Sequence, residues 1–138
     1  MSEYIIENVE KYSLIGNEVL RKTDGESLVI FLNGALGSGK TTFINHFTKE
    51  LGVSCFNSAS YGLVNYCNSH VRIINCDLYR TKWSEEFFEH EIYPLLEKKF
   101  FLFLEWVDPC ILVKNATHIS IQFKLINYNK RLITLEYF

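Results

Sequence analysis

The feature of this sequence that most directly indicates chemistry is a glycine-rich octapeptide, GALGSGKT, at residues 34–41. It matches the pattern G-x-x-x-x-G-K-T, in which glycines let the backbone curve so that successive N–H groups point at nucleotide phosphates. In this pattern the Lys40 ammonium reaches the β- and γ-phosphates, and the Thr41 hydroxyl binds Mg²⁺. The predicted nucleotide-binding residues in and beside the loop are Gly34, Leu36, Gly37, Ser38, Gly39, Lys40, Thr41 and Thr42.

Two carboxylates form the second candidate feature, because each directly follows an apolar run. Asp77 follows residues 71–76, and Glu105 follows residues 100–104. Acids at the carboxyl ends of parallel strands stand in the crevice where an α/β sheet binds its ligand. A phosphate-loop site needs such acids to hold Mg²⁺ and to orient an attacking water. Either acid alone would be read as a solvated strand end, but the upstream loop makes both of them candidate site residues.

The pattern of apolar residues predicts the elements that position these groups. Residues 28–32, 71–76 and 100–104 are continuous apolar runs typical of buried strands, and residues 9–21 have helical spacing. A second helix follows the loop and ends near Gly52, and Ser84 is placed to cap a third helical stretch. Residues 119–125 and 133–137 alternate as a hairpin. We therefore predict an α/β, P-loop NTPase-like sandwich: a mainly parallel sheet flanked by helices, with a C-terminal antiparallel hairpin.

Composition sets the broad class of the protein. The chain has 138 residues, of which 48% are hydrophobic, so we expect residues 1–138 to form a single domain around one core. A net charge of -2 gives no broad cationic face for direct nucleic-acid binding. The sequence shows neither a secretory signal nor an apolar run long enough for a membrane span. We accordingly expect a cytoplasmic protein with no membrane partner.

Missing motifs narrow the chemistry. A guanine-reading N-K-x-D motif is absent, since residues 129–132 read NKRL, and this disfavours a GTPase. Arg80 is the only arginine between Asp77 and Phe100, and this disfavours a small-molecule kinase, whose lid carries several arginines. From the residues alone, three classes stay open: an ATP-hydrolysing switch, a small-molecule or nucleoside kinase, and a nucleotide-dependent assembly module that does not hydrolyse.

Four motifs in order make the chain resemble the bacterial TsaE family, the P-loop ATPase component of tRNA threonylcarbamoyladenosine, t(6)A, biosynthesis. Family members look like L-x-G-D-L-G-x-G-K-T-T, then S-P-T-F/Y-x-L-V, then H-x-D-L-Y-R, then an apolar strand ending in E-W. Here these motifs read LNGALGSGKTT at 32–42, SASYGLV at 58–64, NCDLYR at 75–80 and LEW at 104–106. The likeness is collinear over nearly the whole chain.

The resemblance implies roles for the matched residues, with ATP as substrate and Mg²⁺ as cofactor. Thr41 and Glu105 would bind Mg²⁺. Asp77 and Lys40 would be catalytic, with Asp77 positioning or activating the attacking water. Arg131, at the start of the last strand, would contact the nucleotide. The resemblance also assigns three residues to a switch-like loop near the γ-phosphate: Ser58, Ser60 and Tyr61.

The resemblance also implies partners. Similar proteins bind a complex of TsaD and TsaB and support its repeated turnover by hydrolysing ATP, slowly when alone, so that any contact of this chain with tRNA would be indirect. The sequence departs from the family pattern at three loop positions: Ala35 replaces Asp, Ala59 replaces Pro and Ser60 replaces Thr. These changes affect the expected turnover rate and leave the phosphate and magnesium residues intact. For Trp106, packing at a strand end and a functional role both stay open.

Overall fold

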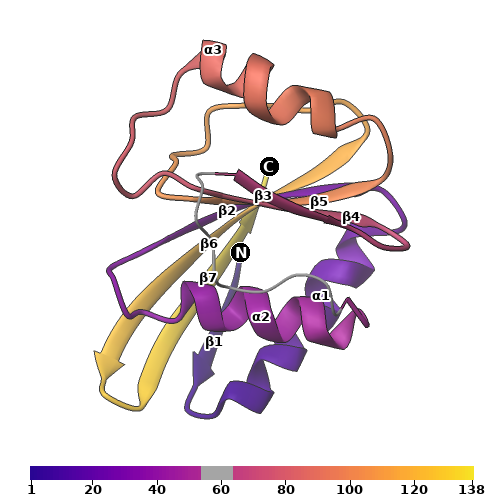
Figure 1. Cartoon of the computed structure of the whole chain (residues 1–138). Helices are drawn as coiled ribbons and strands as arrows, with labels where there is room; N and C mark the ends of the chain where they lie inside the picture. Colours follow the sequence, from indigo (N-terminus) through magenta and orange to yellow (C-terminus); the bar gives the residue numbers. More distant parts are fainter. Residues whose placement is uncertain (54–63) are drawn as a thin grey trace.

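The computed structural model describes residues 1–53 and 64–138 (Figure 1). Its described strands are β1 (Ser2–Ile6), β2 (Ser27–Gly34), β3 (Val64–Asn68), β4 (Arg72–Asp77), β5 (Phe100–Glu105), β6 (Ala116–Asn127) and β7 (Lys130–Tyr137). Its described helical segments are η1 (Val9–Lys11), α1 (Tyr12–Thr23), α2 (Lys40–Glu50), α3 (Glu85–Phe87), the π-helical η2 (Phe88–Ile92) and η3 (Tyr93–Leu95). No helix within these residues is long and apolar enough to cross a bilayer.

The described strands form one mixed sheet in the order β1-β7-β6-β2-β5-β4-β3. The four central neighbours β6, β2, β5 and β4 are parallel, whereas β1, β7 and β3 pair antiparallel at the two edges. The predicted α/β sandwich with its C-terminal hairpin, formed by β6 and β7, is therefore confirmed. Strands β1 and β3 were not predicted from the sequence, because each is a short edge strand that is stabilised by pairing with a neighbouring strand rather than by its own local pattern.

Helices cover both faces of the sheet, which explains the continuous apolar runs of its central strands. Figure 1 shows α1 and α2 on one side and the segment from α3 to η3 on the other. On the first side, Ile15 of α1 and Phe43 of α2 share a buried cluster with Phe103 of β5. On the second side, Ile92 of η2 is buried with Leu102 of β5. Successive residues of β5 thus serve two cores, as expected for a central parallel strand.

The helices lie where the sequence predicted them, and only their first and last residues differ from the prediction. The expected helix at 9–21 begins as a 3₁₀ turn, where the Asn8 side chain accepts a hydrogen bond from the Glu10 N–H at 3.0 Å, and α1 then runs to Thr23. Asp24, in the left-handed region at φ 48°, ends α1. The Ser84 cap is confirmed, since its Oγ accepts from the Phe87 N–H at 3.0 Å.

A buried carboxylate ties α1 to the antiparallel edge of the sheet. Tyr4 of β1 and Tyr137 of β7 donate hydroxyl hydrogen bonds to Glu18, with O···O distances of 2.5 and 2.8 Å. Burial of Glu18 opposes its ionisation, but these hydrogen bonds, together with Ser2 and the charge of Arg21, outweigh that effect and hold the pKa of the carboxyl below its usual value. The middle of α1 is thereby connected to β1 and β7.

Candidate functional site

The glycine-rich loop connects the carboxyl end of β2 to the first turn of α2. Its shape requires glycine at both ends. A Cβ on Gly34 would lie 2.6 Å from the carbonyl oxygen of Phe123 and from Ser38 Oγ, and a Cβ on Gly39 would lie 2.5 Å from the Tyr12 hydroxyl. Gly39 also has φ 113°, where side chains are strained. The loop therefore brings bare backbone to the positive N-terminal end of α2, an arrangement suited to anions.

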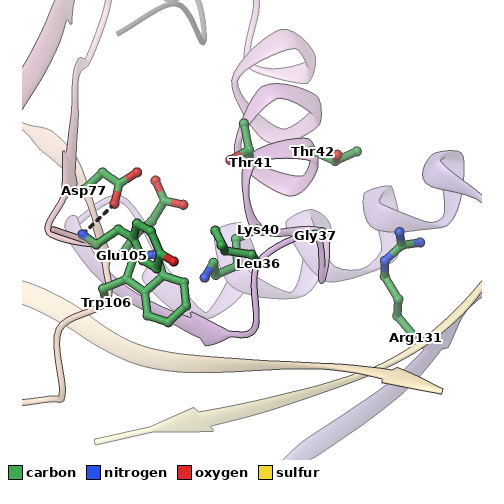
Figure 2. Close-up of a pocket in the computed structure, with 11 residues that line it drawn as sticks. Leu36, Gly37, Lys40, Thr41, Thr42, Asp77, Glu105, Trp106 and Arg131 are labelled. Carbon is green, nitrogen blue, oxygen red and sulfur yellow. Dashed lines mark hydrogen bonds between the residues drawn. The ribbon is translucent and has the colours of Figure 1, made fainter. Parts of the chain in front are cut away.

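The two predicted acids lie side by side at the ends of neighbouring parallel strands. Asp77 of β4 and Glu105 of β5 are register partners, and the backbone N–H of Leu78 donates to the Glu105 carbonyl at 3.1 Å. The Asp77 carboxylate accepts from the Tyr79 N–H at 3.0 Å, the dashed line in Figure 2. Parallel pairing of β4 with β5 therefore places both carboxylates at one edge of the sheet, as the sequence predicted.

The loop and the acids line a common pocket of about 200 Å³. Figure 2 shows the two acids on one side of the loop and Arg131 on the other. The residues that line the pocket are Leu36, Gly37, Gly39, Lys40, Thr41, Thr42, Asp77, Tyr79, Glu105, Trp106 and Arg131. Of the remaining predicted site residues, Gly34 and Ser38 lie in the loop next to this lining, with the Ser38 side chain buried. Ser58, Ser60 and Tyr61 lie outside the described residues.

Lys40 is held inside the pocket by two contacts. Its ammonium donates to the Gly34 carbonyl oxygen at 2.6 Å and lies 3.5 Å from the centroid of the Trp106 ring. A cation over an indole face is attracted by the ring quadrupole. Burial lowers the pKa of Lys40, while the charges of Glu105 and Asp77 act in the opposite direction. The two acids thus help to keep the lysine charged in a place that disfavours charge.

Glu105 is the most strongly perturbed acid of the pocket. Only 3% of its surface is exposed, and this burial, followed by the Asp77 charge, raises its pKa to about 7, against the opposing hydrogen bond from the Asn75 side chain and the charge of Lys40. A divalent cation beside it would favour the ionised carboxylate. Mg²⁺ takes one or two protein oxygens and completes its shell with water or phosphate. The oxygen donors of Glu105 and Thr41 fit that requirement.

Two aromatic residues of the pocket were not assigned a role from the sequence. Tyr79 and Trp106 pack with their ring centroids 4.8 Å apart, beside the acids. Trp106 has φ 64°, an unusual value for a bulky residue, which turns its ring back toward Lys40. The available signals were position, since Tyr79 lies two residues after Asp77 and Trp106 directly follows Glu105, and the inclusion of both residues in the family-like motifs NCDLYR and LEW.

The parallel sheet, the glycine-rich loop and the strand-end acids define this chain as a P-loop NTPase-like protein. Its fold resembles that of the protein in "Crystal structure of Bacillus subtilus YdiB", with a TM-score of 0.64, 22% identity, and coverage of 97% of this chain and 83% of that one. The family model described as "Threonylcarbamoyl adenosine biosynthesis protein TsaE" matches residues 6–133. The chain belongs to the TsaE family.

Individual relatives agree with that assignment. The "tRNA threonylcarbamoyladenosine biosynthesis protein TsaE" of Rickettsia bellii (strain RML369-C) is 35% identical over 115 residues, covering 79% of this chain and 78% of the relative. The protein of the same name from Aquifex aeolicus (strain VF5) is 38% identical over 84 residues, covering 58% of this chain and 62% of the relative. The resemblance predicted from the four motifs is confirmed.

The raised pKa of Glu105 predicts a pH-dependent stability of the protein without metal. Because the folded pKa of about 7 exceeds the ordinary value of 4.5, the free energy of unfolding should fall as pH rises between these values. Glu105→Gln should therefore stabilise the protein, by up to about 3 kcal/mol at pH 8 and by much less at pH 5. Chemical denaturation in a chelating buffer at both pH values measures this. Glu86→Gln on exposed α3 is the matched control, and an equal gain from Glu105→Gln at both pH values would contradict the prediction.

Proposed function

We propose that this protein binds ATP with Mg²⁺, hydrolyses it slowly, and serves as the ATPase of the t(6)A modification machinery by supporting turnover of a TsaD–TsaB complex. The observation that carries the ATPase proposal is the convergence of the phosphate loop, Lys40, Thr41, Asp77 and Glu105 on one pocket. Membership of the TsaE family supports the pathway and the partners.

Binding would begin with an exchange at Lys40. The backbone N–H groups of the loop and the N-terminal end of α2 would receive the β-phosphate. The Lys40 ammonium, now shared between the Gly34 carbonyl and the Trp106 ring, would transfer to β- and γ-phosphate oxygens, which offer full negative charge. Arg131, on the far side of the loop from the acids, would contact the nucleotide there. Charge already present in the pocket would thus be redirected to the ligand.

Hydrolysis would place different demands on the two acids. Thr41 and Glu105 would hold Mg²⁺, which, when bound, neutralises charge on the phosphates. The Asp77 carboxylate would accept a hydrogen bond from a water aligned with the γ-phosphorus. The water oxygen would then bond to phosphorus as the bond to the β–γ bridging oxygen breaks, and the proton that the water loses would pass through Asp77 to the released phosphate, which gives ADP and inorganic phosphate. Lys40 would stabilise the charge that grows on the leaving oxygen.

A bound partner could supply a positive charge beside the γ-phosphate. Arg131 is the arginine that lines the described part of the pocket, and Figure 2 shows it on the opposite side of the loop from Asp77 and Glu105. If Asp77 orients the attacking water, the attacked phosphorus would lie on the side of the acids and not beside Arg131. In other P-loop enzymes an arginine supplied to this position accelerates hydrolysis by about 10³ to 10⁵. If Arg131 does not reach the γ-phosphate, the isolated chain would hydrolyse ATP slowly, and a bound complex that supplied such a charge would accelerate hydrolysis.

This proposal predicts how ATPase activity responds to its partners. Phosphate release should be slow with the isolated protein and faster when purified TsaD and TsaB are added. Lys40→Ala should abolish the activity under both conditions, because it removes the cation aimed at the β- and γ-phosphates. Lys49→Ala, at the exposed end of α2, is the matched control and should behave like the wild type.

The outcomes of that assay separate the alternatives. Equal rates with and without the two proteins would show that they do not complete the site. Full activity in Lys40→Ala would overturn the phosphate-loop assignment. ATP binding without hydrolysis in every condition would favour a nucleotide-dependent assembly module, and phosphate transfer to an added nucleoside would favour a kinase.

The different roles proposed for the two acids predict that ATP binding and hydrolysis rate respond separately to their substitution. Glu105→Ala should weaken Mg²⁺-dependent ATP binding and hydrolysis together, because the metal acts in ground and transition states alike. Asp77→Asn keeps the size of the side chain, so Mg²⁺–ATP affinity should be near normal while the rate falls by about 10² to 10⁴. Calorimetry beside single-turnover hydrolysis measures both quantities. If Asp77→Asn lost as much affinity as Glu105→Ala, Asp77 would belong to the metal shell.

A further inference from the structure

The least explained polar group near the pocket is the hydroxyl of Tyr12, the first residue of α1. Tyr12 is 2% exposed, and its ring packs against Phe43 and His46 of α2 with centroid distances of 5.6 and 6.3 Å. Its hydroxyl oxygen has no hydrogen-bond partner among the described residues. Burying a hydroxyl without a partner is unfavourable. Packing explains why an aromatic ring is present at this position, but it does not explain why the ring carries a hydroxyl group.

A second buried group without a partner lies next to it. The Nε of Arg131 also lacks a hydrogen-bond partner within residues 1–53 and 64–138. A Cβ placed on Gly39 would lie 2.5 Å from the Tyr12 hydroxyl oxygen and 3.1 Å from Arg131 Nε, so both atoms border the same point of the phosphate loop. One group is a hydroxyl that can accept, and the other is an N–H that can only donate. Their chemistry is complementary, because the hydroxyl oxygen can accept the hydrogen bond that the Nε–H can donate.

Two other tyrosines of the protein have hydroxyl groups with a clear structural role. Those of Tyr4 and Tyr137 both donate to Glu18 and so connect α1 to the sheet edge. The Tyr12 hydroxyl makes no such bond, and phenylalanine would fill the same space against α2. Its distinguishing property is its location, between the loop at Gly39 and the arginine that lines the pocket.

We propose that Tyr12 is a positioning residue of the nucleotide site, whose hydroxyl accepts a hydrogen bond from Arg131 Nε when nucleotide is bound. This bond would fix the plane of the guanidinium and leave its two terminal nitrogens for the part of the nucleotide on the Thr42 side of the loop. The inference rests on the proposed ATP binding. It adds to that proposal a residue from α1, outside every motif of the phosphate-loop pattern.

Substitution of the hydroxyl alone tests this role. Tyr12→Phe should weaken Mg²⁺–ATP binding by about 5- to 30-fold, the range expected for one lost buried hydrogen bond, and should leave the melting temperature unchanged or higher. Tyr137→Phe is the matched control, because it removes a hydroxyl that is already bonded in the free protein. It should lower the melting temperature and leave ATP affinity unchanged. Calorimetric titration and thermal denaturation of the full chain give both readouts.

A double-mutant cycle shows whether the effect acts through the arginine. In the Arg131→Ala background, Tyr12→Phe should cause no further loss of ATP affinity. Wild-type affinity in Tyr12→Phe, or losses that simply add in the double variant, would overturn the role given to Tyr12. If the wild-type chain itself bound no ATP, the proposed function would fail first and this inference with it. ATP binding by the wild type that is indifferent to Tyr12→Phe would overturn the inference alone.

Discussion

The site is organised around one buried positive charge, the Lys40 ammonium. Burial disfavours that charge, and the surrounding groups compensate: the Gly34 carbonyl accepts from it, the Trp106 ring faces it, and two carboxylates lie nearby. Neither the neutral Gly34 carbonyl nor the Trp106 ring matches a charged phosphate oxygen as a partner for the ammonium. Lys40 is therefore kept charged and in place, and its ammonium can exchange its present contacts for phosphate oxygens.

The fold provides this environment through strand direction. Parallel pairing of β4, β5 and β2 brings the carboxyl ends of three strands to one edge of the sheet, where they carry Asp77, Glu105 and Gly34. Helices on both faces bury the strands, and the burial of Glu105 at the end of β5, followed by the charge of Asp77, raises the pKa of Glu105 to about 7. Sheet topology and acid electrostatics are thus two consequences of the same arrangement.

The sequence predicted the parts of the site that depend on local order. The loop is a contiguous motif, and Asp77 and Glu105 each end an apolar run, so strand direction alone brought them together. It could not place the Trp106 ring over Lys40, because that contact depends on a backbone turn at φ 64°. It also missed Tyr12, which reaches Gly39 only through the packing of α1 against α2, and the edge strands, whose pairing is not local.

The central claim is that phosphate displaces Lys40 from its present contacts. A crystal structure with Mg²⁺ and a non-hydrolysable ATP analogue tests it most directly. The account predicts the β-phosphate in the loop, the Lys40 ammonium on β- and γ-phosphate oxygens and away from the Trp106 ring, and the metal between Thr41 and Glu105. Phosphates bound outside the loop, or bound there with Lys40 still against Trp106 and Gly34, would contradict it.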